Sequence, residues 1–247
     1  MSEVIALILA AGEGKRMKSS KAKVIHEVCG KPMIEWVYEA AIGAGASKCV
    51  AIVGHGADQV MDSMGNKVDY VMQRQQLGTG HAVQQAYKYY TDSDGCILVL
   101  YGDTPLITSN TISNAIEFLH NGNYKAVVIS ADMSDPFGYG RIIRDENSSF
   151  LRIVEQRDTT EEQKAIKEIN SGMYIFSAKE LADALQLLTN NNDQKEYYLT
   201  DTLEIMLSKG SRVGVYKAED SDEVLGVNDQ EQLRNVSSIM EKRLKSR

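Results

Sequence analysis

The sequence predicts an α/β protein: one large domain with a Rossmann-like, mixed and mainly parallel sheet flanked by helices. Three observations predict this class. Short apolar runs of strand length alternate with stretches of helical period, as in βαβ units. Glycine-rich turns follow several of these runs, at the edge where parallel sheets bind their ligands. The length of 247 residues, with 43% hydrophobic and 25% charged residues, suits one large domain.

The composition argues against several classes of partner and location. A formal net charge of −7 argues against nucleic acid and anionic membrane surfaces as partners. The three cysteines, Cys29, Cys49 and Cys96, are odd in number and far apart, which predicts neither a disulfide framework nor a zinc cluster. The apolar run 5–9 follows Glu3 rather than a basic region, and no stretch of the sequence is long enough to span a bilayer. We therefore expect a cytoplasmic protein.

The first strand is expected at residues 4–9, and the loop after it is the centre of the predicted site. Gly12 and Gly14 let backbone N–H groups approach an anion closely. A Walker loop needs four residues between its first glycine and its Gly-Lys pair, and here one residue separates the glycines. A dinucleotide fingerprint needs a third glycine where Met17 stands. A different phosphate loop remains, with charge also supplied by side chains. The basic residues that follow are Lys15, Arg16, Lys18, Lys21 and Lys23. The competing interpretation is a solvated basic surface loop.

The next elements extend the parallel sheet. Pro32 precedes a helical pattern over 33–42 and suits its first turn. A second strand is expected at 49–53, a short helix at 57–64 and a third strand at 68–72. This βαβαβ order predicts right-handed crossovers, with ligands at the carboxyl ends of the strands.

The polar, glycine-rich loop 73–81 is a second candidate ligand site. It follows the third strand and precedes a helical run at 82–90. An amide side chain such as that of Gln73, together with exposed backbone groups, can recognise the edge of a pyrimidine. The alternative is that Gly78 and Gly80 only shape a turn.

The clearest buried strand, 96–101, ends in Gly102-Asp103-Thr104-Pro105. A carboxylate at this strand end lies at the cleft, where Asp103 can anchor a divalent cation. The alternative role of Asp103 is a turn or helix cap before proline. His81 and His120 have no partner at ligand spacing, and we interpret both as structural.

The rest of the chain predicts a small β-rich insert and a return to the sheet. The segments 139–144 and 150–155 are expected to pair as a hairpin that forms the second wall of the cleft. The other expected elements are a helix at 111–120, a strand at 126–130, helices at 181–188 and 199–207, a strand at 212–216 and a final helix at 230–247.

Short motifs occur in order along nearly the whole chain. The first is LAAGEGKRM (9–17), followed by Lys23 in KVIHEVCGKPM. The others are QLGTGHA (76–82), LYGDTPL (100–106), GYGRI (138–142), IVEQRD (153–158), EIN-G (168–172), EYYLTD (196–201) and GVND (226–229). This ordered series resembles the nucleoside-diphosphate-sugar pyrophosphorylases, and among them the bacterial N-acetylglucosamine-1-phosphate uridylyltransferases. Such a series is far more specific than any single motif.

The resemblance implies a nucleotide-diphospho-sugar transferase fold whose β-rich insert binds the sugar. It implies a nucleotidyltransferase domain at 1–228 and a linker-like C-terminal helix at 229–247. The implied enzyme is a UDP-N-acetylglucosamine diphosphorylase, which transfers uridylyl from UTP to N-acetylglucosamine 1-phosphate with Mg²⁺ as cofactor and serves peptidoglycan and cell wall biogenesis. The implied partners are these two substrates, without nucleic acid or membrane, and self-association is left open.

The resemblance also implies roles for single residues. The catalytic residues are implied to be Arg16, facing the leaving pyrophosphate, Lys23, facing the reacting phosphates, and Asp103. The implied nucleotide site consists of Leu9, Ala10, Ala11, Gly12, Gly14, Lys23, Gln73, Gly78, Thr79, Tyr101 and Gly102. The implied sugar site consists of Gly140, Glu155, Asn170, Tyr197, Thr200 and Asn228. The implied magnesium ligands are Asp103 and Asn228. The alternatives are an ordinary exposed acid for Glu155 and the N-cap of the final helix for Asn228.

One residue departs from the family pattern, because Ala22 stands where a proline usually precedes the lysine. A less rigid loop is then expected before Lys23. The competing functions are another sugar-phosphate nucleotidylyltransferase and a catalytically silent regulatory domain of the same fold. In bifunctional relatives the final helix leads to an acetyltransferase domain of hexapeptide repeats. The sequence contains no such repeats, so we expect no acetyl transfer from acetyl-CoA by residues 1–247.

Overall fold

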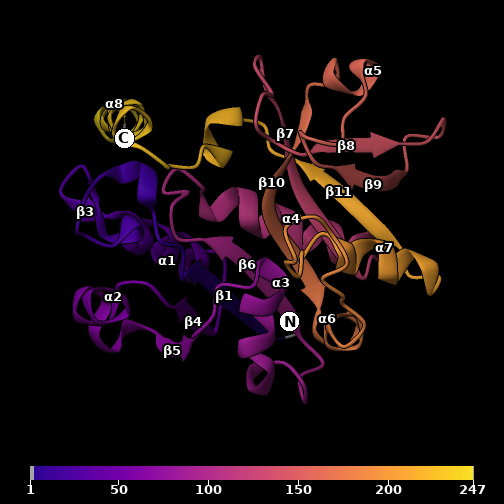
Figure 1. Cartoon of the computed structure of the whole chain (residues 1–247), viewed down its shortest axis with the longest axis horizontal. Coiled ribbons are helices and arrows are strands. Elements are labelled where there is room, and N and C mark those ends of the chain that lie inside the picture. The colour runs from indigo at the N-terminus through magenta and orange to yellow at the C-terminus, as the bar shows by residue number, and fades with distance from the viewer. Residues whose placement is uncertain (1–2, 247) are drawn as a thin grey trace.

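The computed structural model describes residues 3–246. Its centre is a mixed sheet whose main strands run in the order β11-β7-β10-β6-β1-β4-β5 (Figure 1). These strands are β1 (Val4–Ala10), β4 (Lys48–Val53), β5 (Asp69–Met72), β6 (Cys96–Tyr101), β7 (Ala126–Asp132), β10 (Glu168–Ser177) and β11 (Val213–Lys217). Strand β1 pairs in parallel with β4 and β6, β4 with β5, and β11 with β7, whereas β10 runs antiparallel to β6 and β7. The predicted mixed, mainly parallel sheet is confirmed.

Within residues 3–246, six helices cover the two faces of this sheet. The helices on one face are α1 (Met33–Gly43), α2 (Ala57–Met64) and α4 (Ser109–Asn121); those on the other are α3 (Thr79–Gln85), α6 (Ala178–Leu185) and α7 (Asp201–Ser208). Because side chains alternate along a strand, β1 serves both layers: Ala6 and Ile8 join the first apolar cluster, and Leu7 and Leu9 join the second. The helix predicted at 82–90 begins earlier and ends at Gln85, where a 3-10 turn, Tyr87–Tyr89, replaces it.

The long strand β10 was missed by the sequence analysis. Gly172 interrupts it with a φ of +81°, and its register with β7 shifts between Asn170 and Tyr174. Such a bulge breaks the regular alternation by which a strand is recognised in a sequence. The strand lies between β6 and β7, so it brings Asn170 into the middle of the sheet.

The predicted hairpin is confirmed. Strand β8 (Arg141–Arg144) pairs antiparallel with β9 (Phe150–Val154). The side chain of Asp145 closes the turn, because its Oδ1 accepts from the backbone N of Asn147 at 2.9 Å and of Ser149 at 2.8 Å. A one-turn helix, α5 (Glu161–Lys164), follows and is held by a capping box at Thr160.

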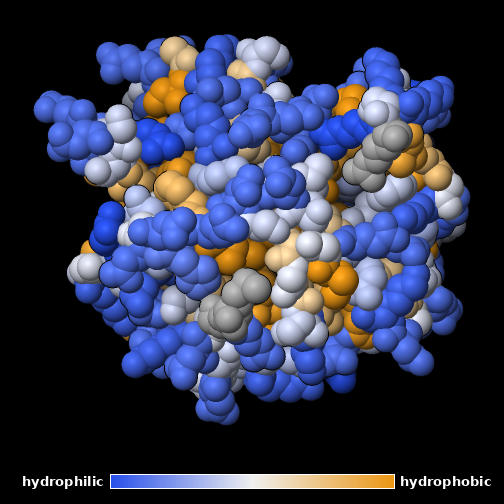
Figure 2. All heavy atoms as spheres, turned by 180° about the vertical axis from the view of Figure 1, so that it is seen from behind, coloured by the Kyte–Doolittle hydropathy of each residue, from blue (hydrophilic) through white to orange (hydrophobic). Residues whose placement is uncertain are grey.

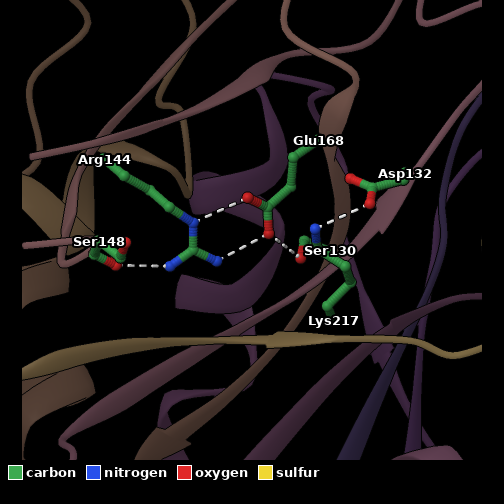
Figure 3. A network of polar contacts seen from close by, with 6 residues as sticks. All are labelled: Ser130, Asp132, Arg144, Ser148, Glu168 and Lys217. Atoms are coloured by element: carbon green, nitrogen blue, oxygen red, sulfur yellow. Dashed lines mark hydrogen bonds and ion pairs between the residues drawn. The ribbon is translucent and has the colours of Figure 1, made fainter.

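An ion-pair network joins this insert to the sheet (Figure 3). Arg144 of β8 reaches Glu168 of β10 with two hydrogen bonds, of 2.8 and 2.7 Å, and Ser130 of β7 donates to the same carboxylate at 2.7 Å. Burial raises the pKa of Glu168, but the hydrogen bonds from Arg144 and Ser130 outweigh burial and lower it. Beside the network, Lys217 pairs with Asp132 at 2.8 Å. The network therefore ties β8 to β7 and β10 two residues before Asn170.

The final helix, α8 (Gln230–Lys245), packs against the start of the chain (Figure 1). Its residues Val236 and Met240 share an apolar cluster with Met17 of the first loop. The cluster also contains Val28, Met33, Leu106 and Val227, close to the short pair β2 (Glu27–Val28) and β3 (Lys31–Pro32). The N-cap is Asp229, whose Oδ1 accepts from Glu231 N and Gln232 N, so the alternative role of Asn228 as N-cap is wrong. The domain boundary between 228 and 229 stays a prediction.

The lengths of the helices and the hydropathy of the surface indicate whether the structure has features of a membrane-spanning protein. Within residues 3–246, no helix has both the length and the apolar character needed to cross a bilayer. The face seen in Figure 2 is mostly hydrophilic, with hydrophobic side chains in separate patches. Single exposed apolar side chains of this kind are usual on protein surfaces.

Candidate active site

A cavity of about 230 Å³ opens beside the carboxyl ends of β1 and β6. Its lining residues are Leu9, Ala10, Ala11, Gly12, Lys23, Val24, Gln73, Gln76, Gly78, Thr79, Ala82, Tyr101, Asp103 and Glu196. Nine of the eleven residues predicted for the nucleotide line this cavity, and Asp103 lines it as well. The structure therefore brings the first loop, the loop 73–81 and the end of β6 around one space.

The two remaining glycines of the predicted nucleotide site lie behind this lining. Gly14 has a φ of +63°, and a Cβ added to it would lie 2.7 Å from the Cβ of Lys23. Gly102 donates its N–H to Leu9 O at 3.0 Å, and an added Cβ would lie 3.1 Å from a methyl group of Val24. Gly14 needs glycine because of its positive φ and the close approach of Lys23, whereas a side chain at position 102 would require Val24 to shift. They shape the loop rather than line the cavity.

Four lining residues were missed by the sequence analysis: Val24, Gln76, Ala82 and Glu196. All four fall inside quoted motifs, which was the available signal. Glu196 reaches the cavity because its segment docks on the loop 73–81. Tyr197 N donates to Leu77 O at 2.8 Å, Gly80 N donates to Tyr197 O at 2.8 Å, and Leu199 N donates to Thr79 Oγ1 at 3.1 Å.

The amide of Gln73 has a fixed orientation. The side chain is buried, and its Nε2 donates to Gly78 O at 3.1 Å and lies 3.1 Å from Nδ1 of His81. A backbone carbonyl can only accept, so the amide nitrogen must face Gly78. Burial lowers the pKa of His81, which favours the neutral ring, whose Nδ1 can accept. Gln73 therefore offers its carbonyl oxygen as the amide atom free for a ligand in the cavity.

Lys23 joins the two residues predicted to hold a metal ion. Its Nζ donates to Asp103 Oδ2 and, at 3.3 Å, to Asn228 Oδ1. Val227 N donates to Asp103 O at 2.9 Å and brings the segment 225–228 to the strand end. The side chain of Asp103 thus holds Lys23, while residue 103 itself lies in the turn that follows β6. Two oxygen atoms that converge on one cation suit a sparse divalent site, completed by substrate and water. Within residues 3–246, no group of three or more His, Cys, Asp or Glu side chains could hold a metal.

Three of the predicted sugar residues gather at the insert. Asn170 N donates to Gly140 O at 2.8 Å, and a Cβ on Gly140 would lie 3.4 Å from Glu155 Oε2. Burial raises the pKa of Glu155, and the negative charges of Asp158 and Asp201 raise it further. Glu155 is nevertheless exposed.

The other predicted site residues lie elsewhere. Asn228 stays with Lys23, Tyr197 docks on the loop 73–81, and Thr200 directly precedes α7. Arg16 is exposed on the 3-10 turn Lys15–Met17, whose Met17 is buried. The roles of these residues stay predictions.

Comparison with known proteins decides the family. The family described as MobA-like NTP transferase domain matches residues 6–203. The chain belongs to this family. The MobA-like NTP transferase domain contains every residue that lines the cavity, whereas Asn228 lies beyond the matched range. As a member, the chain is a nucleotidyltransferase.

Three curated relatives carry the name bifunctional protein GlmU. The relative from Acetivibrio thermocellus is 52% identical over 247 residues, which are 100% of this chain and 54% of that protein. The relative from Caldanaerobacter subterraneus subsp. tengcongensis is 47% identical over 244 residues, 99% of this chain and 53% of that protein. The relative from Thermoanaerobacter pseudethanolicus is 47% identical over 247 residues, 100% of this chain and 54% of that protein. The MobA-like NTP transferase described here thus spans about half the length of the curated relatives it matches.

Proposed function

We propose that the chain transfers uridylyl from UTP to N-acetylglucosamine 1-phosphate and releases pyrophosphate. The proposal makes it a UDP-N-acetylglucosamine diphosphorylase that acts in the cytoplasm. Its support is the shared cavity of the predicted nucleotide residues, the family match and the similarity to GlmU proteins over the whole chain.

The observation that carries the choice of base is the orientation of Gln73. Its amide nitrogen is engaged by Gly78 O, and its carbonyl oxygen remains as the acceptor. At N3, uracil offers an N–H donor, whereas cytosine offers an acceptor. An acceptor fixed in a buried position discriminates strongly, because a mismatched base leaves polar groups unpaired. Gln73 therefore favours UTP over CTP.

The reaction needs alignment and charge neutralisation more than a nucleophilic side chain. An oxygen of the sugar phosphate attacks the α-phosphorus of UTP in line, the bond to the β-phosphate oxygen breaks, and pyrophosphate leaves with the electron pair. Phosphoryl-type transfer depends mainly on positioning and electrostatics. In our proposal, the amides of the first loop hold the nucleotide, Lys23 faces the reacting phosphates, and Arg16 faces the leaving pyrophosphate.

In this proposal Asp103 and Asn228 would hold Mg²⁺, which neutralises phosphate charge when bound. The contact of both side chains with one ammonium group supports their fitness for a cation. Lys23 would then leave this position and become available to the phosphates.

For the sugar, we propose Gly140, Glu155 and Asn170 as the first contacts. A carboxylate, an amide and a backbone carbonyl suit hydroxyl groups and an acetamido group. The contacts among these residues support one common subsite.

The decisive experiment measures pyrophosphate release over a panel of nucleoside triphosphates and sugar 1-phosphates, with Mg²⁺ and with EDTA. We expect the highest kcat/KM for UTP with N-acetylglucosamine 1-phosphate, and loss of turnover in EDTA. A preference of tenfold or more for another base or sugar, about 1.4 kcal/mol, would favour a related nucleotidylyltransferase. Release with none of the pairs would favour a catalytically silent domain.

A further inference from the structure

The backbone before Lys23 has the conformation of a proline without containing one. Ala22 has a φ of −55° and a ψ of 138°, and it is buried. A proline ring fixes φ near −65°, so this value lies in the proline range. Ala22 has no ring to hold it there, and the next residue is the lysine that contacts Asp103.

Gln59 of helix α2 holds this conformation with both ends of its side-chain amide. Its Oε1 accepts from Ala22 N at 2.8 Å, and its Nε2 donates to Ser20 O at 3.1 Å. One side chain thus binds the loop at two backbone atoms that lie two residues apart. A rotation of the loop would break at least one of these bonds.

Close packing supports the same segment from two sides. A Cβ added to Gly56, the N-cap of α2, would lie 2.8 Å from the Cβ of Ala22. An added Cβ on Gly14 would lie 2.7 Å from the Cβ of Lys23. Ala22 and Lys23 are therefore fixed between the first loop and α2, and Gln59 adds the directional contacts.

We propose that Gln59 is a positioning residue for Lys23. Its side-chain amide restrains the backbone at Ala22 as a proline ring at that position would. Gln59 does not touch the cavity, so it acts only through the segment 20–23. The inference rests on the proposed function, because Lys23 is assigned there to the reacting phosphates. A proline at position 22 and the hydrogen bond from the backbone N of this residue to Gln59 exclude one another, because proline has no N–H to donate.

The test uses Gln59→Ala, Ala22→Pro, the double variant and a matched control. The control is Asp62→Ala, which removes an exposed side chain from the same helix. We expect Gln59→Ala to lower kcat about 10-fold with KM for UTP unchanged, because a displaced catalytic group costs rate more than ground-state binding. We expect the double variant to recover kcat to within about twofold of the unmodified chain, since the proline restores the lost restraint.

Hydrogen exchange supplies a readout that does not depend on turnover. The amides of Ile25 and His26 donate to Ala22 O and Lys23 O. Their exchange should accelerate in Gln59→Ala, stay unchanged in Asp62→Ala and slow again in the double variant.

Three results would overturn the inference. The first is an unchanged kcat in Gln59→Ala, and the second is a loss of kcat that the proline does not restore. The third is unchanged exchange at Ile25 and His26. If the unmodified chain releases no pyrophosphate with any substrate pair, the proposed function fails, while the exchange data still decide whether Gln59 restrains the loop.

Discussion

Lys23 is held between two oxygen atoms that also suit a divalent cation. Its ammonium contacts Asp103 Oδ2 and Asn228 Oδ1, and its side chain is mostly buried. A metal ion and an ammonium group cannot occupy one position. In our proposal Lys23 therefore competes with the metal ion in the nucleotide-free protein, and it becomes available to the phosphates when the metal binds.

The first prediction concerns the exchange of these two cations. Lys23→Met should lower kcat by about 100-fold, the usual cost of losing one charged group that stabilises a transition state. The same variant should bind Mn²⁺ more tightly in the absence of nucleotide, since no ammonium competes. Calorimetry or Mn²⁺ spectroscopy measures this affinity. The control Lys21→Met changes an exposed lysine of the same loop. Unchanged Mn²⁺ affinity in Lys23→Met would argue against a shared position.

The second prediction concerns the pH dependence of sugar use. A carboxylate accepts hydrogen bonds with both oxygens only when ionised, so kcat/KM for the sugar phosphate should fall as the pH falls through the raised pKa of Glu155. Asp158→Asn removes a negative neighbour, which makes ionisation of Glu155 easier and lowers its pKa. The acid limb of the pH profile should therefore move to lower pH. The control Asp94→Asn, on an exposed loop before β6, should leave the limb in place. A shift to higher pH would contradict the assignment.

At the residue scale, the sequence predicted the residues around the cavity better than the contacts among them. Lys23 and Asp103 are identified by their motifs, but only Asp103 follows a strand end directly, and the sequence analysis did not predict that the two side chains meet. The hydrogen bonds of Gln59 to the segment 20–22 were not predicted. Gln59 lies 37 residues from Ala22 in the sequence, and only the fold brings the two residues together. Among the missed lining residues Glu196 has the same explanation, because its segment docks on the loop 73–81.

Among the elements, strand β8 carries two arginines with different tasks. Arg141 is fully buried and donates to Tyr139 O and, at 3.0 Å, to Gln156 Oε1, which also accepts from Gly138 N. It thereby closes the turn 136–140 against the end of β9, where Gly140 and Glu155 lie. Arg144 instead ties the other end of β8 to Glu168 (Figure 3).

The third prediction separates these tasks with a matched pair of variants. Arg141→Met should raise KM for the sugar phosphate several-fold and leave KM for UTP unchanged, because only the turn beside Gly140 loosens. Arg144→Met should leave both KM values unchanged and lower the free energy of unfolding by about 3 kcal/mol, since Glu168 loses its charge partner. Kinetics and thermal unfolding measure the two effects. Equal changes in both KM values for Arg141→Met would show a general loss of structure instead.

Regular elements were predictable, and the irregular one was not. The strands 4–9 and 96–101 are continuous apolar runs, and the hairpin has an Asp-Glu-Asn-Ser turn between two strand patterns. Strand β10 combines polar residues, a glycine with positive φ and a bulge, so its local pattern resembles a loop. The strand forms because it pairs with β6 and β7, and the local sequence pattern does not predict this pairing.

For the whole molecule, alternation of strand and helix predicted the layers, and the order of the strands remained open. The motif EIN-G put Asn170 in the predicted sugar site, but it did not predict that this residue lies in the middle of the sheet. Which strands pair over long sequence distances depends on the other strands of the sheet, because a strand such as β10 can add only to an edge that those strands have formed.

The central position of β10 has a consequence for folding during synthesis on the ribosome. One edge of β6 pairs with β1, and the other edge stays unpaired until residues 174–177 of β10 have been synthesised. Until they emerge, a growing chain presents the bare apolar edge of Cys96–Tyr101, which is a template for mispairing. Lys23 meets Asn228 across 205 residues of sequence, so this contact can form only after residue 228 has been synthesised. A nascent chain that has not reached residue 228 therefore lacks the contact of Lys23 with Asn228, one of the two residues that we propose as metal ligands.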